Sequence, residues 1–344
     1  MKIALDCRYI GRSGIGRVCK GIADNLDYDK NEYYLIGKRE QLKNYPAARI
    51  IEDDTDPYSV KGLLSFDKRI NKECDALFIP NFIVPFGVRL PVYTVMHDLM
   101  FLDVKETTKG LIDKTVKKIL LKRCVKKSRA VFCVSAFTRD RCAHYYKRYA
   151  DNFVVNHIGL SPEVKEFALR HGKVAAESKK NTLVFVGNVK PHKGLKTLAE
   201  AYKLLPKGMY TLKIIGEKDN FLNGMDYADI QCEGIEFTGR ISDGELFSEV
   251  AAAKFLIQPS LYEGFGIPPM EALYLGTKPI ISDIPVFREV YGDTEAVFFK
   301  AGDAVELKDK ILASDPQVDR GEQILKYDYR KTADNIIGRI TGKC

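Results

Sequence analysis

The sequence has no long hydrophobic run. No segment approaches the roughly 18 consecutive apolar residues of a membrane-spanning helix. Its first residues, MKIALDCRYIG, enter a strand-like pattern directly and do not have the layout of a secretory signal peptide. These two absences predict a cytoplasmic protein.

The chain also has no cysteine pairs at metal-binding spacing. Its eight cysteines include no C-x-x-C pair, and most lie inside apolar runs, so buried reduced thiols explain them better than disulfides or zinc. Low-complexity tracts and fixed-period repeats are absent as well. A chain of 344 residues with 45% hydrophobic and 29% charged residues is typical of a soluble protein of about two domains.

Positive charge is concentrated in one segment. The whole chain carries a net charge of +8, but residues 105–148 hold fourteen Lys or Arg against three acidic residues. Within this segment, residues 109–127 have a helical period. Leu111, Ile112, Val116, Ile119, Leu120 and Val125 form its apolar positions, and lysines occupy many of the others. This pattern predicts a core helix with a solvated outer face.

Apolar strand-like runs alternate with helix-like segments along the chain. Runs that are apolar on both faces predict parallel sheets covered by helices on each side. The expected strands are 2–6, 33–37, 76–80, 92–98, 130–135 and 153–158, then 182–187, 211–216, 235–239, 255–260, 278–283 and 296–300. A polar, lysine-rich stretch at 161–180 separates the two series. We therefore expect an N-terminal domain at 1–165, a second domain at 180–325, and a C-terminal helix at 326–344 that can pack back on the first domain.

Three loops that follow expected strands have glycines and charges suited to a ligand. Ligands of open parallel sheets bind beyond the carboxyl ends of the strands, where helix N-termini offer backbone N–H groups to phosphate. The first loop contains Gly14, Gly16 and Arg17, and the second is GNVKPHKG, with Lys193. The third, SLYEGFGIPPMEALYLG, places Glu263 and Glu271 eight residues apart around Gly264 and Gly266. Spacing alone leaves this third loop open between a ligand site and an ordinary glycine-rich turn.

In order, these motifs resemble the retaining, nucleotide-sugar-dependent glycosyltransferases of family 4, whose fold is called GT-B. The matching segments are Asp6, Arg8 and Ser13 to Arg17, MHDL at 96–99, VSAFT at 134–138, VGNVKPHKG at 186–194, TGRISDGEL at 238–246 and PSLYEGFGIPPMEAL at 259–273. The resemblance implies an α/β protein in which two Rossmann-like domains with parallel sheets face one another across a cleft.

The resemblance also implies roles for individual residues. Glu271 is expected to bind the nucleotide ribose, and Glu263, with the N–H groups from Gly264 through Phe265 to Gly266, the donor sugar. Lys193 matches the lysine that neutralises the departing diphosphate, so that no metal is required. Gly14, Gly16 and Arg17 would approach the same diphosphate. His97 matches a histidine near the reacting carbon, although MHD alone would favour a core histidine bonded to a backbone carbonyl.

The diphosphate-binding loop departs from the family pattern. Many relatives carry an arginine where this chain has Asn188, and others carry one at the position of His192. Lys190 or Arg240 could provide a second positive charge, and the sequence does not decide between them. Glu263, Lys193 and His97 are thus the expected catalytic residues, and Asn188 and Arg240 complete the expected donor site.

The implied reaction is transfer of a hexose or deoxyhexose, with retained configuration, from a nucleoside diphosphate to a hydroxyl of a glycan. GDP-mannose, dTDP-rhamnose and UDP-hexoses remain open as donors, no further cofactor is expected, and the acceptor is expected to be a surface glycan, lipid-linked or not. A nucleotide-sugar 2-epimerase and a non-catalytic sugar-nucleotide-binding protein remain alternatives. The charge of residues 105–148 indicates an anionic membrane surface, which would place the protein peripherally at the inner face of the plasma membrane. Nucleic acid is not expected as a partner, because no aromatic stacking motif accompanies the charge.

Two other patterns are interpreted as coincidences. Asp54-Thr55-Asp56 and Asp27-Tyr28-Asp29 match the D-x-D pattern of metal-dependent glycosyltransferases, but both lie in polar connections away from any expected strand end, so we interpret them as solvated turns. GRSGIG resembles a nicotinamide-cofactor loop, yet the second strand ends in Gly37-Lys38-Arg39, without the acidic residue that binds ribose in dehydrogenases.

Overall fold

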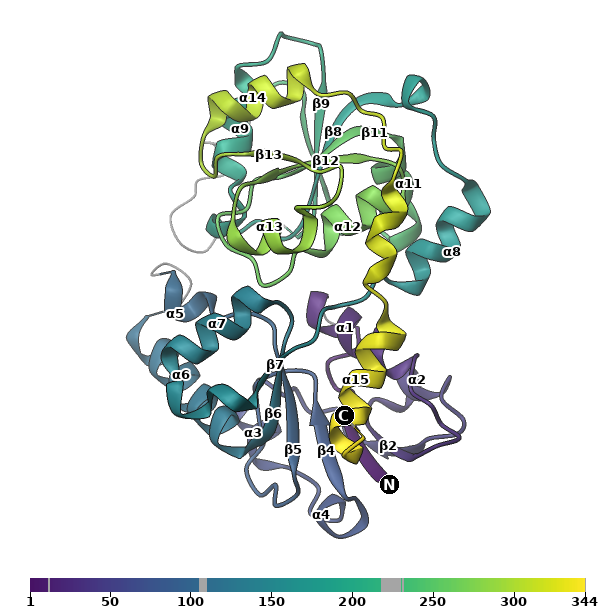
Figure 1. Ribbon diagram of the computed structural model, residues 1–344, viewed down its shortest axis with the longest axis vertical. Coiled ribbons are helices and arrows are strands. Elements are labelled where there is room, and N and C mark those ends of the chain that lie inside the picture. The colour runs from purple at the N-terminus through teal and green to yellow at the C-terminus, as the bar shows by residue number, and fades with distance from the viewer. Residues whose placement is uncertain (12, 105–109, 218–229, 231, 344) are drawn as a thin grey trace. The chain divides into compact units, whose positions relative to one another are not determined.

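The chain forms two Rossmann-like domains. The computed structural model describes residues 1–11, 13–104, 110–217, 230 and 232–343. Unit 1 contains Met1–Gly159 and Tyr327–Cys344, and unit 2 contains Leu160–Lys326 (Figure 1). The first segment of unit 1 thus ends before residue 165, and the polar stretch that starts at Ser161 belongs to unit 2.

Unit 1 is built on a seven-stranded parallel sheet. Its strand order is β3-β2-β1-β4-β5-β6-β7, so the direction of winding reverses between β1 and β4. The central strands are apolar on both faces, and Ile3, Ala4 and Leu5 of β1 are completely buried. The strands are β1 (Lys2–Asp6), β2 (Glu32–Gly37), β3 (Arg49–Glu52), β4 (Ala76–Ile79), β5 (Val92–Met96), β6 (Ser128–Cys133) and β7 (Phe153–Val155).

Helices cover this sheet, and one of them comes from the end of the chain. The C-terminal helix α15 lies beside α1 (Figure 1). Asn156 holds α15 by donating from Nδ2 to the carbonyl of Thr332 at 3.0 Å, and the Thr332 hydroxyl donates to the carbonyl of His157 at 2.8 Å. The helices are α1 (Ser13–Ala23), α2 (Arg39–Leu42), α3 (Val60–Leu64), α4 (Ile70–Glu73), α5 (Met100–Asp103), α6 (Leu111–Lys127), α7 (Ala136–Tyr145), the 3₁₀ segment η2 (Lys147–Asn152) and α15 (Tyr329–Thr341).

Strand β3 corrects one interpretation from the sequence. Arg49–Glu52 pairs in parallel with β2, with Ile50 opposite Leu35. Asp54-Thr55-Asp56 therefore follows the carboxyl end of a strand and does not lie away from one. Asp53, Asp54 and Thr55 line a pocket there together with Arg8.

Unit 2 repeats the same winding with six parallel strands. Its order is β10-β9-β8-β11-β12-β13, and the reversal falls between β8 and β11. Leu183, Phe185, Phe255 and Ile257 form the core where these two strands adjoin. The strands are β8 (Lys180–Val186), β9 (Thr211–Ile215), β10 (Ile235–Gly239), β11 (Ala253–Gln258), β12 (Lys278–Ser282) and β13 (Val297–Phe299).

Helices α8, α11 and α14 of unit 2 each begin after a capping side chain. Ser242 and Glu245 form a reciprocal capping box at the start of α11, which satisfies the first free N–H groups of that helix. The helices are α8 (Pro162–His171), α9 (Leu195–Lys203), α11 (Asp243–Ala252), α12 (Ile267–Tyr274), α13 (Pro285–Tyr291) and α14 (Ala304–Ala313), with 3₁₀ segments η3 (Ala176–Ser178), η4 (Pro191–Lys193) and η5 (Gly321–Lys326).

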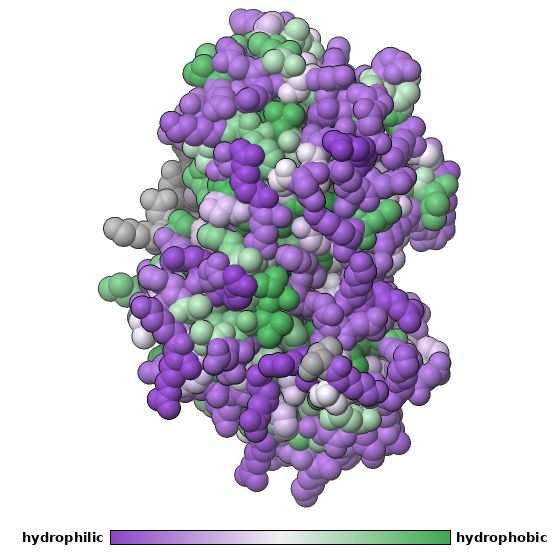
Figure 2. Space-filling model, viewed as in Figure 1, coloured by the Kyte–Doolittle hydropathy of each residue, from purple (hydrophilic) through white to green (hydrophobic). Residues whose placement is uncertain are grey.

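Hydrophilic residues dominate the face of the molecule in Figure 2, with apolar patches between them. Among the described residues, none of the helices combines the length and hydropathy required to cross a bilayer. The described cysteines are free thiols, buried except for the partly exposed Cys232, whereas Cys344 lies outside the described residues.

Candidate functional site

The candidate site of unit 2 lies at the reversal of its sheet. The loops after β8 and β11 meet there, because those strands are neighbours although they are far apart in sequence. Leu261 N–H donates to the carbonyl of His192 at 2.8 Å. Gly194 has φ +69°, and a Cβ there would lie 1.9 Å from the carbonyl oxygen of Pro259. The two loops are therefore interlocked through their backbones.

Lys193 and Glu263 form an ion pair between these loops. Lys193 Nζ lies 2.6 Å from Glu263 Oε1, which also accepts a hydrogen bond from the Ser260 hydroxyl at 2.7 Å. The exposed fractions of the two charged side chains are only 21% and 11%. Burial raises the pKa of Glu263, but the charge and hydrogen bond of Lys193 and the Ser260 hydroxyl outweigh burial, so its pKa is lowered overall. Glu263 is therefore a carboxylate at neutral pH.

The glycine loop leads directly into α12. Gly266 has φ +87° at the N-cap, and the Tyr291 hydroxyl donates to its carbonyl. Gly264 precedes the buried Phe265 in this loop. Glu271 lies inside α12 and is only 3% exposed. A buried carboxylate beside a loop with a left-handed glycine provides directional acceptors and little freedom of movement.

The second positive charge at this edge of the sheet is not supplied by His192. Burial, reinforced by the charge of Lys193, lowers the pKa of His192 to about 4, so the imidazole is neutral at pH 7. Arg240 follows β10 and is 69% exposed, with its guanidinium 3.5 Å from Glu217. Asn188 follows Gly187 at the end of β8 and is partly exposed. Lys193 is thus the one cation that contacts Glu263 among the described contacts of this loop.

The other predicted residues belong to unit 1. Gly14 and Gly16 lie in the first turn of α1, followed by Arg17. A Cβ at Gly16 would lie 2.4 Å from the Tyr9 carbonyl oxygen, so glycine allows this helix to begin close to the end of β1.

His97 follows β5, and its Nε2 lies 2.8 Å from the carbonyl oxygen of Pro80. This is the backbone contact expected of a core histidine. Burial lowers its pKa, although Pro80 and Asp98 act in the opposite direction. The imidazole is therefore neutral, with Nε2 donating to Pro80 and Nδ1 left as an acceptor.

Sequence reasoning missed the groups that orient Glu263. Ser260 donates to its carboxylate, and Gln258 Nε2 donates to the Ser260 hydroxyl at 3.0 Å. Both are completely buried. A polar residue at the end of an otherwise apolar strand was the available signal. Within the described ranges, no group of three or more His, Cys, Asp or Glu side chains is arranged to hold a metal ion.

The chain is similar in sequence to known glycosyltransferases. Residues 167–314 match the family model described as glycosyl transferases group 1. The chain is 28% identical over 221 residues to the O-antigen chain mannosyltransferase RfbU of Salmonella typhimurium, covering 60% of each chain. It is 26% identical over 236 residues to O-antigen chain mannosyltransferase B of Escherichia coli, covering 63% of this chain and 59% of the relative. The matches thus span less than two thirds of these relatives.

Solved structures share the whole fold. HepE of Anabaena, in complex with UDP-glucose, superimposes with a TM-score of 0.71 at 14% identity, covering 99% of this chain and 100% of that one. At this level of identity, the similarity shows the fold alone, which is two Rossmann-like domains.

Proposed function

Because residues 167–314 match the group 1 glycosyltransferases and the chain is similar to O-antigen mannosyltransferases, we propose that it transfers a sugar from a nucleoside diphosphate to a hydroxyl of a growing glycan. The observation that carries this proposal is the Lys193–Glu263 pair at the reversal of the second sheet, with Glu271 buried in the helix that follows. This edge is where open α/β sheets bind nucleotides.

The three charged residues divide the work on the donor. The Lys193 ammonium stabilises the negative charge that develops on the departing diphosphate. Glu263, held by Lys193 and Ser260, accepts hydrogen bonds from hydroxyls of the donor sugar. Glu271 accepts hydrogen bonds from the ribose hydroxyls, which a buried carboxylate can do with both oxygens.

The reaction retains anomeric configuration through attack on the face of the leaving group. The bond from the anomeric carbon to the diphosphate oxygen breaks, the acceptor oxygen forms the new bond on the same face, and its proton passes to the departing phosphate. The alternative route, double displacement, requires a carboxylate nucleophile. Glu263 is the candidate for that nucleophile, but its ion pair with Lys193 makes it a poor one. A trapped glycosyl-enzyme intermediate would contradict attack on the leaving-group face.

Among the open donors, the two curated relatives favour a mannosyl donor, since both are named as mannosyltransferases. They also favour a surface polysaccharide as the product, because both are named for O-antigen chains. Product analysis separates transfer from epimerisation of the donor.

Nucleotide sugars are expected to stabilise the protein against heat. A donor at 100 times its Kd adds about 2.7 kcal/mol of stability.

Glu271→Gln removes the charge from the ribose hydrogen bonds, worth about 1.5–3 kcal/mol, and is expected to weaken nucleotide binding about tenfold or more. Glu263→Gln is expected to lower turnover while the nucleotide alone still binds. Thermal shift and calorimetry with GDP, UDP, dTDP and their sugars measure both effects.

Glu200→Gln is the matched control, because Glu200 is an exposed residue of α9 in the same unit. It should bind nucleotides like the unaltered protein. Absence of stabilisation by every nucleotide sugar would refute the proposed function. Equal losses of nucleotide affinity in the Glu263 and Glu271 variants would refute the division of roles.

We further propose that α6 binds an anionic membrane surface. The structure corrects the expected packing of this helix: Leu120 and Val125 are buried, as are Leu121 and Cys124. In contrast, four of the expected core residues are exposed: Leu111 by 85%, Ile112 by 83%, Val116 by 47% and Ile119 by 59%. Residues 105–109, which include Lys105 and Lys109, lie outside the described part of the chain.

Apolar and basic groups alternate on the exposed face. Lys118, Lys122 and Lys126 follow one another at four-residue spacing beside the exposed apolar residues. Phe86, which is 43% exposed, lies under the guanidinium of Arg123, 4.4 Å from its carbon to the ring centre. Apolar side chains rimmed by lysines are typical of a helix that lies in the headgroup region of a bilayer.

Vesicles that contain anionic lipid are expected to bind the protein, and neutral vesicles are expected to bind it weakly. Ile112→Ser with Ile119→Ser should reduce the partition coefficient about a hundredfold or more, since burying each such side chain contributes about 1.5–3 kcal/mol. High salt should also reduce binding, because each lysine near the surface contributes about 1 kcal/mol. Co-sedimentation measures these partition coefficients.

Leu169→Ser provides the control, since Leu169 is 84% exposed on α8 and therefore equally accessible. If that substitution reduced vesicle binding as much as the α6 substitutions, or if lipid charge made no difference, the membrane role of α6 would be wrong.

A further inference from the structure

A polar pocket opens at the carboxyl ends of the first three strands of unit 1. It has a volume of about 130 Å³ and collects residues that follow β1, β2 and β3. None of the motifs assigned to the donor includes the residues that follow β2 and β3. The polar residues that line it are Arg8, Lys38, Gln41, Asp53, Asp54 and Thr55.

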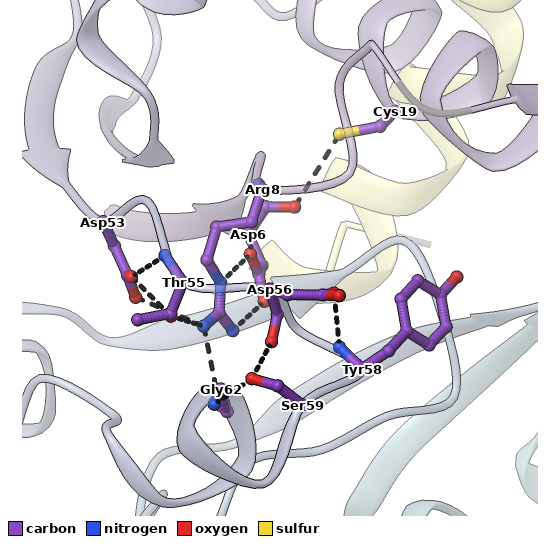
Figure 3. A network of polar contacts seen from close by, with 9 residues as sticks. All are labelled: Asp6, Arg8, Cys19, Asp53, Thr55, Asp56, Tyr58, Ser59 and Gly62. Atoms are coloured by element: carbon purple, nitrogen blue, oxygen red, sulfur yellow. Dashed lines mark hydrogen bonds and ion pairs between the residues drawn. The ribbon is translucent and has the colours of Figure 1, made fainter.

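The floor of the pocket is a saturated network around Arg8 (Figure 3). Its Nε and Nη2 donate to the two oxygens of Asp6 at 2.9 and 2.7 Å. Nη1 donates to Asp53 at 3.2 Å and to Thr55 at 3.1 Å. Burial alone would lower the pKa of Arg8, but its bonds to Asp6 and the charge of Asp53 raise that pKa above the usual value. The floor is therefore rigid and permanently charged.

The rim of the pocket differs from the floor, because its polar side chains are exposed or partly exposed. The side chains of Lys38, Gln41 and Asp54 form no hydrogen bond or ion pair with the part of the chain that the structure describes. Lys38 and Asp54 are exposed, and Gln41 is partly exposed. An ammonium group can only donate hydrogen bonds, a carboxylate can only accept them, and an amide can do both. The rim thus offers both kinds of partner above a floor whose own groups are already bonded.

The charges at the pocket disfavour an anion. Arg8 and Lys38 are outnumbered by carboxylates, because Asp53 and Asp54 also line the pocket and Asp6 pairs with Arg8, so the local balance is negative. Hydroxyl groups of a sugar both donate and accept, which fits a rim that carries an amide, a carboxylate and an ammonium group. Ile10 adds one apolar contact for the face of a ring.

We propose that this pocket binds one neutral sugar residue of the acceptor glycan. Asp54 and Gln41 hold its hydroxyls, and Lys38 donates to a third oxygen. This proposal rests on the proposed function, since it gives the acceptor chain a fixed contact on unit 1. Arg8, Asp53 and Thr55 act as positioning residues, because they keep the rim in place through the loop after β3.

Saturation-transfer NMR of the whole protein with methyl α-mannoside, α-glucoside and α-galactoside tests the pocket directly. We expect transfer to at least one of these glycosides and its loss in Gln41→Leu with Asp54→Asn. Inorganic phosphate at the same concentration should not displace the glycoside. In transfer assays, the two substitutions should raise the acceptor KM about tenfold and leave kcat and the donor KM unchanged.

Glu40→Gln is the matched control, since Glu40 is adjacent on α2 but its side chain is 88% exposed and does not line the pocket. Equal saturation transfer in the pocket variant and the unaltered protein would overturn the proposal, as would displacement by phosphate. If nucleotide sugars stabilise the protein but no glycoside binds, only the pocket assignment fails. If no nucleotide sugar binds, the proposed function fails, and this assignment fails with it.

Discussion

Replacing Lys193 with alanine is expected to lower kcat/KM by about 10²–10³-fold, the effect of removing one group that stabilises developing charge in an active site. The reason is geometric: Lys193 Nζ lies 2.6 Å from Glu263 and is the cation found in contact with that carboxylate. Its loss removes positive charge from the departing diphosphate. It also raises the pKa of Glu263, because burial is then less strongly opposed. Steady-state kinetics at saturating acceptor measure the effect.

Lys196→Ala is the control for this experiment. Lys196 is an exposed residue of α9, three positions further along the chain, so it tests for a general effect of lost positive charge. Lys196→Ala should leave kcat/KM nearly unchanged. A similar loss in both variants, or a Lys193→Ala enzyme with normal turnover, would show that Lys193 does not act on the leaving group.

Replacing Arg8 with methionine is expected to lower the free energy of unfolding of unit 1 by about 3–5 kcal/mol, as when one partner of a buried ion pair is removed. The exposed fractions of the Arg8 and Asp6 side chains are 5% and 3%, so water cannot replace the lost bonds. Asp6→Asn in the same chain should recover part of the loss, because it removes the unpaired charge. Hydrogen exchange of β1 amides during urea titration reports on unit 1 separately from unit 2.

A second pair provides the comparison. Arg69 and Asp67 are also two positions apart and lie 2.7 Å from one another, but Arg69 is 76% exposed. Arg69→Met should have little effect on unfolding, since solvent screens exposed pairs. If both substitutions destabilise unit 1 equally, the burial of Arg8 is not the cause.

Strand patterns in the sequence predicted most of both sheets, and the exception is informative. Arg49–Glu52 has four residues and a charged residue at each end, so its two isoleucines do not stand out as a strand. It becomes β3 because it pairs with β2. Asp54 and Thr55 consequently looked like a solvated turn, although tertiary pairing brings them beside Arg8.

Helix α6 illustrates a second limit. Its spacing predicted a helix with one apolar side in the core, and a helix does form there, but the side of the helix that packs is decided by its neighbours. Leu120 and Leu121 reach the core while Leu111 and Ile112 remain exposed. The spacing of apolar residues in the sequence does not determine which side of the helix packs against the core.

In the candidate site too, the sequence identified individual residues but not the contacts that the fold creates between them. Lys193, Glu263 and Glu271 were identified from motifs, and their loops follow the strands expected to hold them. The ion pair joins residues 70 positions apart, and it depends on β8 and β11 being neighbours. Ser260 and Gln258 were missed, because only the folded loop shows that they converge on one carboxylate oxygen.

The return of α15 to unit 1 has a consequence for synthesis on the ribosome. Unit 2 is continuous in sequence, whereas unit 1 is completed by residues that follow it. Tyr329 packs so closely that a Cβ at Gly21 would lie 2.6 Å from its ring. While unit 2 is being synthesised, α1 and the backbone at His157 therefore lack their contacts with α15. Unit 2 can therefore fold first, whereas unit 1 is complete only after α15 has been synthesised and has packed against it.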